Sequence, residues 1–167
     1  MGRGETHTSA AFVVRPMTEV DALAVAGWRY PEQYAFYNAD ADPADLAELL
    51  DPAEWGLRYF AVDGDDHQLA GFFVFKPAGE DVEIGLGLRP ELTGDGLGGA
   101  FIEAGLQFAE QRFAARSFSL AVATFNTRAI TVYCRAGFRV VQSYQHETNG
   151  GVHSFVRMTR GPILPHN

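Results

Sequence analysis

The stretch that decides the fold is residues 81–99, which read DVEIGLGLRPELTGDGLGG. From Asp81 to Leu88, apolar residues alternate with charged residues and glycine, which predicts a β-strand with one buried face. Pro90 to Gly99 is a glycine-rich loop, and phenylalanine and alanine at helical spacing then predict a helix over Ala100 to Phe113. A loop between a strand and a helix N-terminus is suited to binding a phosphate, because backbone N–H groups and the helix dipole attract anions there.

Three interpretations of this loop are open. Gly94, Gly96 and Gly99 satisfy the G-x-G-x-x-G spacing of dinucleotide-binding proteins, but that motif requires an acidic residue about 20 positions later. No Asp or Glu occurs between Glu110 and Glu147, which argues against it. A P-loop requires Gly-Lys-Ser/Thr, which does not follow here. The third interpretation is a glycine-rich turn without a function.

The flanking sequence predicts a single series of strands and helices. The elements before the loop are a strand over Phe12–Arg15, helices over Asp21–Trp28 and Pro43–Leu50, and a hairpin of Arg58–Val62 and Leu69–Phe75. The elements after it are a strand over Ser117–Ala123, a helix over Asn126–Ala136 closed by Gly137, and a hairpin of Phe138–Tyr144 and Val152–Thr159. No repeat or linker divides them. We expect one domain over 11–160, with a flexible leader over 1–10 and a tail over 161–167.

Composition excludes several classes of partner. The chain has 167 residues, with 13 Lys and Arg against 21 Asp and Glu and a net charge of -8, so nucleic acid is not an expected partner. No run approaches the roughly 18 to 20 apolar residues that span a bilayer, so no membrane partner is expected. The single cysteine, Cys134, cannot form an internal disulfide, which favours a reducing, cytoplasmic location, and we expect it to be buried. The five histidines are dispersed, so no metal is expected.

The order of elements resembles the GNAT superfamily of acyl-CoA-dependent N-acetyltransferases from Phe12 to Thr159. In that family the loop reads Q/R-x-x-G-x-G/A, and residues 93–98 fit this pattern except at Thr93. A second signature is an Asn, a helix that carries Tyr, and then Gly-Phe, and it is present as Asn126, Tyr133 and Gly137-Phe138. The resemblance implies an α/β fold with a mixed, largely antiparallel twisted sheet flanked by helices and a splayed central strand pair. It also implies acetyl-CoA as co-substrate.

The resemblance further implies where CoA binds. The backbone of Leu86 and Leu88 is the expected pantetheine site, and Asn126 shares a helical face with Tyr133 and Ile130 that looks onto the thioester. Gly85 and Gly87 predict a β-bulge and close approach of a ligand. The pyrophosphate is expected on the amides of Gly94, Asp95, Gly96, Leu97, Gly98 and Gly99. Thr93 replaces the usual Gln or Arg, and the carboxylate of Asp95 is unfavourable beside a pyrophosphate unless it points to solvent.

Acetyl transfer to an amine requires a base for the ammonium and an acid for the departing thiolate. Tyr133 is the candidate general acid, and its alternative role is that of a tyrosine in the core. Glu83 is the candidate base, directly or through water, because it lies on the open face of its strand. A solvated strand glutamate is the alternative.

The acceptor is expected to be a cationic amine, either a small molecule or a basic peptide. Seven acidic residues and no basic ones lie between Arg29 and Arg58, where the family builds its acceptor pocket. Tyr34, Tyr37 and Asp40 are the candidate contacts, by cation–π interaction and charge. The alternative is a solvated acidic helix packed by its aromatic residues. For the whole protein, the alternative is a non-catalytic acyl-CoA-binding or sensory domain, and both a monomer and a homodimer are open.

Overall fold

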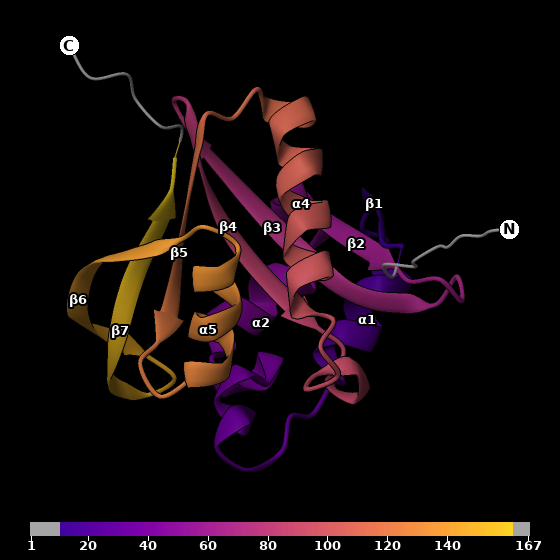
Figure 1. The fold of residues 1–167 in the computed structure, drawn as a ribbon. Helices are drawn as coiled ribbons and strands as arrows, with labels where there is room; N and C mark the ends of the chain where they lie inside the picture. Colours follow the sequence, from indigo (N-terminus) through magenta and orange to yellow (C-terminus); the bar gives the residue numbers. More distant parts are fainter. Residues whose placement is uncertain (1–10, 162–167) are drawn as a thin grey trace, which may run out of the picture.

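A computed structural model describes residues 11–161 (Figure 1). The predicted leader, and the predicted tail after Gly161, lie outside the described residues. The strands are β1 (Val13–Pro16), β2 (Tyr59–Asp63), β3 (Leu69–Ala78), β4 (Asp81–Leu88), β5 (Ser117–Ala123), β6 (Arg139–Thr148) and β7 (Gly151–Arg160). The α-helices are α1 (Glu19–Ala26), α2 (Pro43–Leu49), α3 (Pro52–Trp55), α4 (Gly98–Phe113) and α5 (Thr127–Arg135), and the 3₁₀ helices are η1 (Glu32–Tyr37), η2 (Ala39–Ala41) and η3 (Pro90–Leu92).

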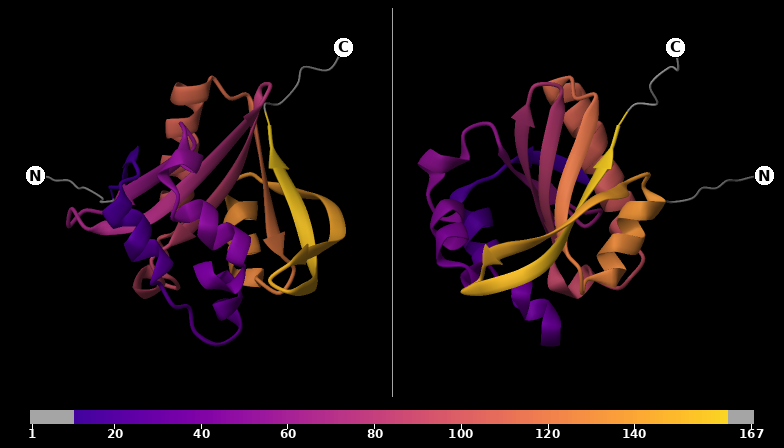
Figure 2. Two further views of the ribbon diagram at one scale, coloured as in Figure 1. Left: turned by 180° about the vertical axis from the view of Figure 1, so that it is seen from behind. Right: turned by 90° about the vertical axis from the view of Figure 1, so that its left-hand side faces the viewer.

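The seven strands form one sheet in the order β1-β2-β3-β4-β5-β7-β6. Every neighbouring pair is antiparallel except β4 and β5, which are parallel. The helices α1 and α2 cover one face of this twisted sheet, and α4 and α5 cover the other (Figure 2). The mixed, largely antiparallel sheet flanked by helices that the sequence predicts is therefore confirmed.

Each face of the sheet has its own hydrophobic core. The larger core lies under α4 and α5 and includes Phe73, Phe75 and Phe101, all of which are essentially inaccessible to solvent. The smaller core lies under α1, α2 and α3 and includes Trp55 and Tyr59. Because adjacent residues of a strand point to opposite faces, β3 contributes alternate residues to both cores. This double anchoring fixes β3 and the neighbouring strand β4.

The predicted elements agree closely with the structure in the central sheet and less well before it. The strands β4 and β5 have the predicted bounds. The segment between α1 and β2 contains η1, η2 and α3, which the sequence analysis missed. The helix α3 begins at Asp51-Pro52, where the Asp51 carboxylate accepts the Ala53 N–H at 3.0 Å. An Asp followed by Pro is an N-terminal helix signal and was available in the sequence. Within residues 11–161, no helix is long and apolar enough to cross a membrane.

Candidate functional site

The parallel strands β4 and β5 separate and leave a gap in the middle of the sheet. They pair at three positions, of which the last joins Glu83 to Ser119. Beyond it, β4 continues to Leu88 and β5 to Ala123, and the strands diverge toward their carboxyl ends (Figure 1). This gap, called the β4–β5 gap below, confirms the predicted splayed pair. A cavity of about 950 Å³ includes the gap and extends to the segment that carries η1, η2 and α2.

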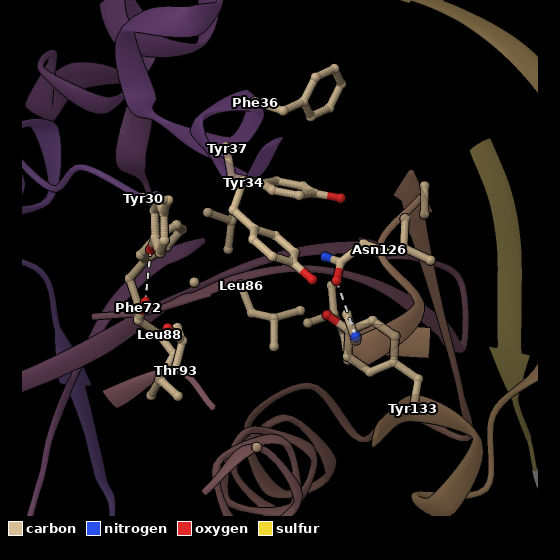
Figure 3. Close-up of a pocket in the computed structure, with 18 of the residues that line it drawn as sticks. Tyr30, Tyr34, Phe36, Tyr37, Phe72, Leu86, Leu88, Thr93, Asn126 and Tyr133 are labelled. Carbon is tan, nitrogen blue, oxygen red and sulfur yellow. Dashed lines mark hydrogen bonds between the residues drawn. The ribbon is translucent and has the colours of Figure 1, made fainter. Parts of the chain in front are cut away.

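The backbone of β4 presents hydrogen-bonding groups to the gap. Arg89 directly follows β4, and its N–H donates to the carbonyl of Ala70 in β3 at 2.7 Å. In an antiparallel pair, hydrogen-bonded and non-hydrogen-bonded residues alternate. The backbone groups of Leu88 and Leu86, one and three residues before Arg89, therefore point away from β3 and toward the gap. Both residues line the cavity (Figure 3), which supports their assignment to a pantetheine arm that binds like an added strand.

The prediction of a β-bulge at Gly85 and Gly87 is wrong. The pairing of β3 with β4 continues through both glycines without a shift in register. Gly87 lies directly opposite Phe72, and a Cβ atom on Gly87 would be 2.4 Å from the Phe72 ring. Directly opposed residues of a pair share one face of the sheet, so Gly87 makes room for Phe72 and keeps β4 straight.

The glycine-rich loop leads into the N-terminus of α4. Gly94 and Gly96 have φ angles of 82° and 77°, which side chains disfavour. The first turn of α4 contains no acidic residue and has no side-chain cap. Its first intrahelical bond runs from the Phe101 N–H to the Leu97 carbonyl at 3.0 Å, so the preceding amides of the helix have no intrahelical acceptor. The 16-residue helix thus provides an anion-binding end beside the gap.

The predicted pyrophosphate residues separate into two groups. Gly94, Gly96, Gly98 and Gly99 line the cavity, together with Thr93. Asp95 and Leu97 are not among the lining residues, and Asp95 is exposed. Exposure to solvent is the condition under which a carboxylate is tolerated in this loop, and Asp95 meets it.

Arg128 is a site residue that the sequence analysis missed. Its guanidinium lies 4.4 Å from the centre of the Tyr34 ring, and its Nη1 atom would be 3.5 Å from a Cβ on Gly94. The contact depends on close packing of α4 against α5, where Gly98 meets Val132. Spacing along the sequence gives no sign of this packing. Arg128 brings a positive charge to the loop in which Thr93 replaces the basic or amide residue of the family pattern.

Asn126 and Tyr133 both line the cavity, as their shared helical face predicts (Figure 3). The Asn126 side chain caps α5 by accepting the Ala129 N–H at 3.1 Å. The third member of the predicted face, Ile130, packs into the larger core instead. Burial raises the pKa of Tyr133 above its ordinary value, and the neighbouring Tyr37 adds to this effect. The phenol therefore keeps its proton at neutral pH, as a general acid must.

Glu83 lies at the closed end of the gap. It is half-buried, lines the cavity and is opposite Lys76 on β3 and Ser119 on β5. Ser119 is 1% exposed and donates to the Asp81 carboxylate at 2.9 Å. Its oxygen accepts a hydrogen bond from Arg157 at 3.0 Å. This polar network joins β4, β5 and β7 at the last position where the gap is closed, and so holds Glu83 at its edge.

The predicted acceptor residues are placed in different surroundings. Tyr34 and Tyr37 line the cavity, and the Tyr37 hydroxyl accepts the Ala123 N–H at 3.3 Å. Burial raises the pKa of Tyr37. Asp40 is not among the lining residues, and its carboxylate pairs with Arg29 at 3.1 Å. The Arg128 guanidinium already lies over the Tyr34 ring, so less of the ring is free for a cation–π contact with another group.

Three other acidic residues, Asp42, Asp45 and Glu48, line the cavity. Asp42 caps α2, and it also accepts the Thr148 hydroxyl at 2.9 Å and the Asn149 N–H at 3.2 Å. Burial, followed by the charges of Asp42 and Glu48, raises the pKa of Asp45. The acidic segment between Arg29 and Arg58 therefore places three carboxylates at the cavity, but not the carboxylate of Asp40.

One expectation outside the cavity is overturned. Cys134 is exposed, so its predicted burial is wrong: α5 and its C-cap residue turn Ile130, Tyr133 and Ala136 toward the larger core and leave Cys134 outside. Within the described part of the chain, no group of three His, Cys, Asp or Glu side chains is arranged to hold a metal ion.

A sheet split between two parallel strands, with a helix N-terminus beside the opening, defines the class of acyl-CoA-dependent acyltransferase folds. The sequence pattern of the acetyltransferase (GNAT) domain matches residues 12–139, and the chain belongs to this family. A mycothiol acetyltransferase from Clavibacter sepedonicus is 33% identical over 145 residues, which cover 83% of this chain and 46% of that protein. The homologous protein from Clavibacter michiganensis subsp. michiganensis gives the same identity and coverage. The chain thus spans about half the length of the curated relatives that it matches.

Solved structures share the fold at low sequence identity. A GNAT-family acetyltransferase from Bacillus anthracis has a TM-score of 0.72 at 18% identity, covering 90% of this chain and 94% of that one. A spermidine N-acetyltransferase from Vibrio cholerae, solved with CoA and spermine, has a TM-score of 0.70 at 19% identity, covering 89% and 94%. At this identity the likeness establishes the fold alone.

Proposed function

We propose that the protein transfers an acetyl group from acetyl-CoA to a primary amine of a small molecule or peptide. The observation that carries this proposal is that Glu83 and Tyr133 line one cavity, which also takes in the gap-facing strand β4 and the N-terminus of α4. A thioester held along β4 would therefore be accessible to both residues. The Vibrio relative solved with CoA and spermine supports an amine acceptor.

The reaction is direct attack of the amine on the thioester carbonyl. A C–N bond forms and the C–S bond breaks, which gives an amide and the free thiol of CoA. Glu83 first takes a proton from the ammonium group, directly or through a water molecule, and the resulting neutral amine attacks. Tyr133 gives its proton to the departing thiolate, and the raised pKa of its phenol keeps that proton available. The nitrogen loses its second proton as the amide forms, and this proton restores the Tyr133 phenol.

Cofactor contacts follow from the same geometry. The backbone of Leu86 and Leu88 would hold the pantetheine arm, and the amides of Gly94, Gly96, Gly98 and Gly99 would hold the pyrophosphate. Arg128 would add a charge-assisted hydrogen bond to a phosphate. Asn126 would contact CoA through its amide nitrogen, because its oxygen is already bound to Ala129. Asp95 and Leu97 would contribute backbone groups only.

We propose a cationic acceptor. The cavity wall on the side of α2 carries three carboxylates, from Asp42, Asp45 and Glu48, whereas Asp40 is neutralised by Arg29. Attraction of a positive amine to this wall would raise its local concentration near the gap. A panel of polyamines, aminoglycosides, amino acids and basic peptides should therefore give more CoA release than neutral or acidic amines. Equal rates across the panel would reject a cationic acceptor without affecting the assignment of acetyl transfer.

The variant Tyr133→Phe tests the chemistry. We expect kcat to fall by about 10²- to 10⁴-fold, the usual contribution of a positioned acid, while the KM for acetyl-CoA changes by less than about threefold because the ring remains. Tyr144→Phe is the matched control, since Tyr144 is a half-buried tyrosine outside the cavity lining. An unchanged kcat would exclude Tyr133 as the acid. If the wild-type protein binds acetyl-CoA but releases no thiol with any amine, the non-catalytic acyl-CoA-binding or sensory alternative applies.

A further inference from the structure

One of the gap-facing backbone groups of β4 already has a partner. The Tyr30 hydroxyl donates to the Leu88 carbonyl at 2.7 Å (Figure 3). Among the described residues, no other side chain hydrogen-bonds the backbone of Leu86 or Leu88. Tyr30 precedes η1 and is 58 positions from Leu88 in sequence, so only the fold brings the two together.

Tyr30 is fixed at both ends. Its backbone N–H donates to the Asn38 side-chain oxygen at 2.8 Å, which ties it to the turn between η1 and η2. Its ring is half-buried in the cavity wall, which also includes Trp28 and Phe72. Burial raises the pKa of Tyr30, and the charge of Glu91 adds to this. The phenol therefore remains a proton donor throughout the physiological range.

A pantetheine arm that binds β4 like an added strand places its amide N–H groups against carbonyls that point into the gap. The Leu88 carbonyl is one of these, and it lies at the end of β4 nearest the glycine-rich loop. Tyr30 holds this acceptor in the free protein. A pantetheine amide can take the position of the Tyr30 hydroxyl only after the hydrogen bond from Tyr30 to the Leu88 carbonyl is broken. The strength of this bond therefore opposes cofactor binding.

We propose that Tyr30 is a positioning residue that occupies the Leu88 carbonyl in the free protein and yields it to a pantetheine amide when CoA binds. The proposal rests on the proposed function, since it requires CoA to bind along β4. Exchange of this bond frees the Tyr30 side chain next to the segment that carries Tyr34 and Tyr37.

The test is the affinity of CoA for the full chain, measured by isothermal titration calorimetry on the wild-type protein and on Tyr30→Phe. Loss of the hydroxyl removes a competitor, so the Kd for CoA should fall by about two- to tenfold, as for one typical hydrogen bond. Tyr59→Phe is the matched control. Tyr59 also lines the cavity, but its hydroxyl bonds Glu48 rather than β4. The Kd of this variant for CoA should match that of the wild type.

A Kd for Tyr30→Phe equal to or higher than that of the wild type would overturn the proposal, as would an equal fall in both variants. Absence of CoA binding to the wild-type protein would instead overturn the proposed function, and this inference with it. If Tyr30→Phe does not fold, a crystal structure of the wild-type complex with CoA gives the answer. The distance from the Tyr30 hydroxyl to the Leu88 carbonyl should exceed 3.5 Å, and a retained hydrogen bond would refute the exchange.

Discussion

At Gly105, α4 packs closely against Phe73 of the sheet, and replacement of Gly105 by alanine has two opposing effects. In a helix interior, Gly→Ala normally stabilises by about 1 kcal/mol. Here a Cβ atom would lie 2.3 Å from Cζ of Phe73, more than 1 Å inside the normal carbon contact distance of about 3.5 Å. Phe73 is completely buried and stacks on Phe75 and Phe101 at ring-centre distances of 5.4 and 4.7 Å. The ring cannot move aside, so α4 must shift.

Overpacking of a well-filled core costs about 1–3 kcal/mol, and more where nothing relaxes. The clash therefore outweighs the gain in helix propensity, and we expect Gly105→Ala to lower the free energy of unfolding by about 1–2 kcal/mol net. For a chain of this size that lowers Tm by roughly 2–8 °C. Since α4 also directs its N-terminus at the gap, the Kd for CoA should rise in the same variant.

The assay is urea unfolding followed by circular dichroism, with Gly99→Ala as the control in the same helix. A Cβ on Gly99 meets no atom within 4 Å, so its unfolding free energy should stay constant or rise by up to about 1 kcal/mol. If Gly105→Ala were as stable as the wild type with an unchanged m-value, the argument that close packing requires glycine here would be refuted.

Two further predictions concern charged residues. Burial of Asp21 opposes its ionisation, but hydrogen bonds from Arg15 and from Thr18 outweigh this and lower the pKa of the carboxyl. A lowered pKa means that the stabilisation is present above the unfolded value of about 3.9 and is lost as the pH falls through the folded value. Asp21→Asn should cost about 1.5–3 kcal/mol at pH 7 and flatten the curve of unfolding free energy below pH 4; parallel curves would contradict this. Arg128→Gln should raise the Kd for CoA roughly tenfold and make its dependence on salt concentration shallower. Arg116→Gln is the control: Arg116 is exposed and directly precedes β5, so both quantities should stay unchanged. An unaltered Kd in Arg128→Gln would exclude Arg128 from CoA binding.

The site was predictable where it depends on local sequence. The alternation from Val82 to Leu88 identified β4 and its two faces, and the glycines after it identified the loop and the start of α4. Asn126 and Tyr133 reached the cavity because seven residues are two helical turns. These features repeat over short distances, so periodicity and turn chemistry define them without knowledge of the fold.

The residues that sequence analysis missed or misplaced depend on distant contacts. Arg128 reaches the loop because α5 packs on α4, and Tyr30 reaches Leu88 across 58 positions. Asp40 and Asp42 are two residues apart in one acidic segment, yet Arg29 binds the first, while the β6–β7 hairpin binds the second and the cavity includes it. Composition shows that the segment is acidic but not which carboxylate remains available.

The sequence by itself therefore determined the order of the strands and of the longer helices α1, α2, α4 and α5, the glycine loop and the family, because each is recorded in spacing along the chain. The tertiary structure decided which backbone groups face the β4–β5 gap, that Phe72 rather than a bulge accounts for Gly87, and that Arg128 and Tyr30 line the cavity. These outcomes depend on which side chains meet across the sheet. Strand register, helix packing and burial determine these contacts, and all three are properties of the folded chain.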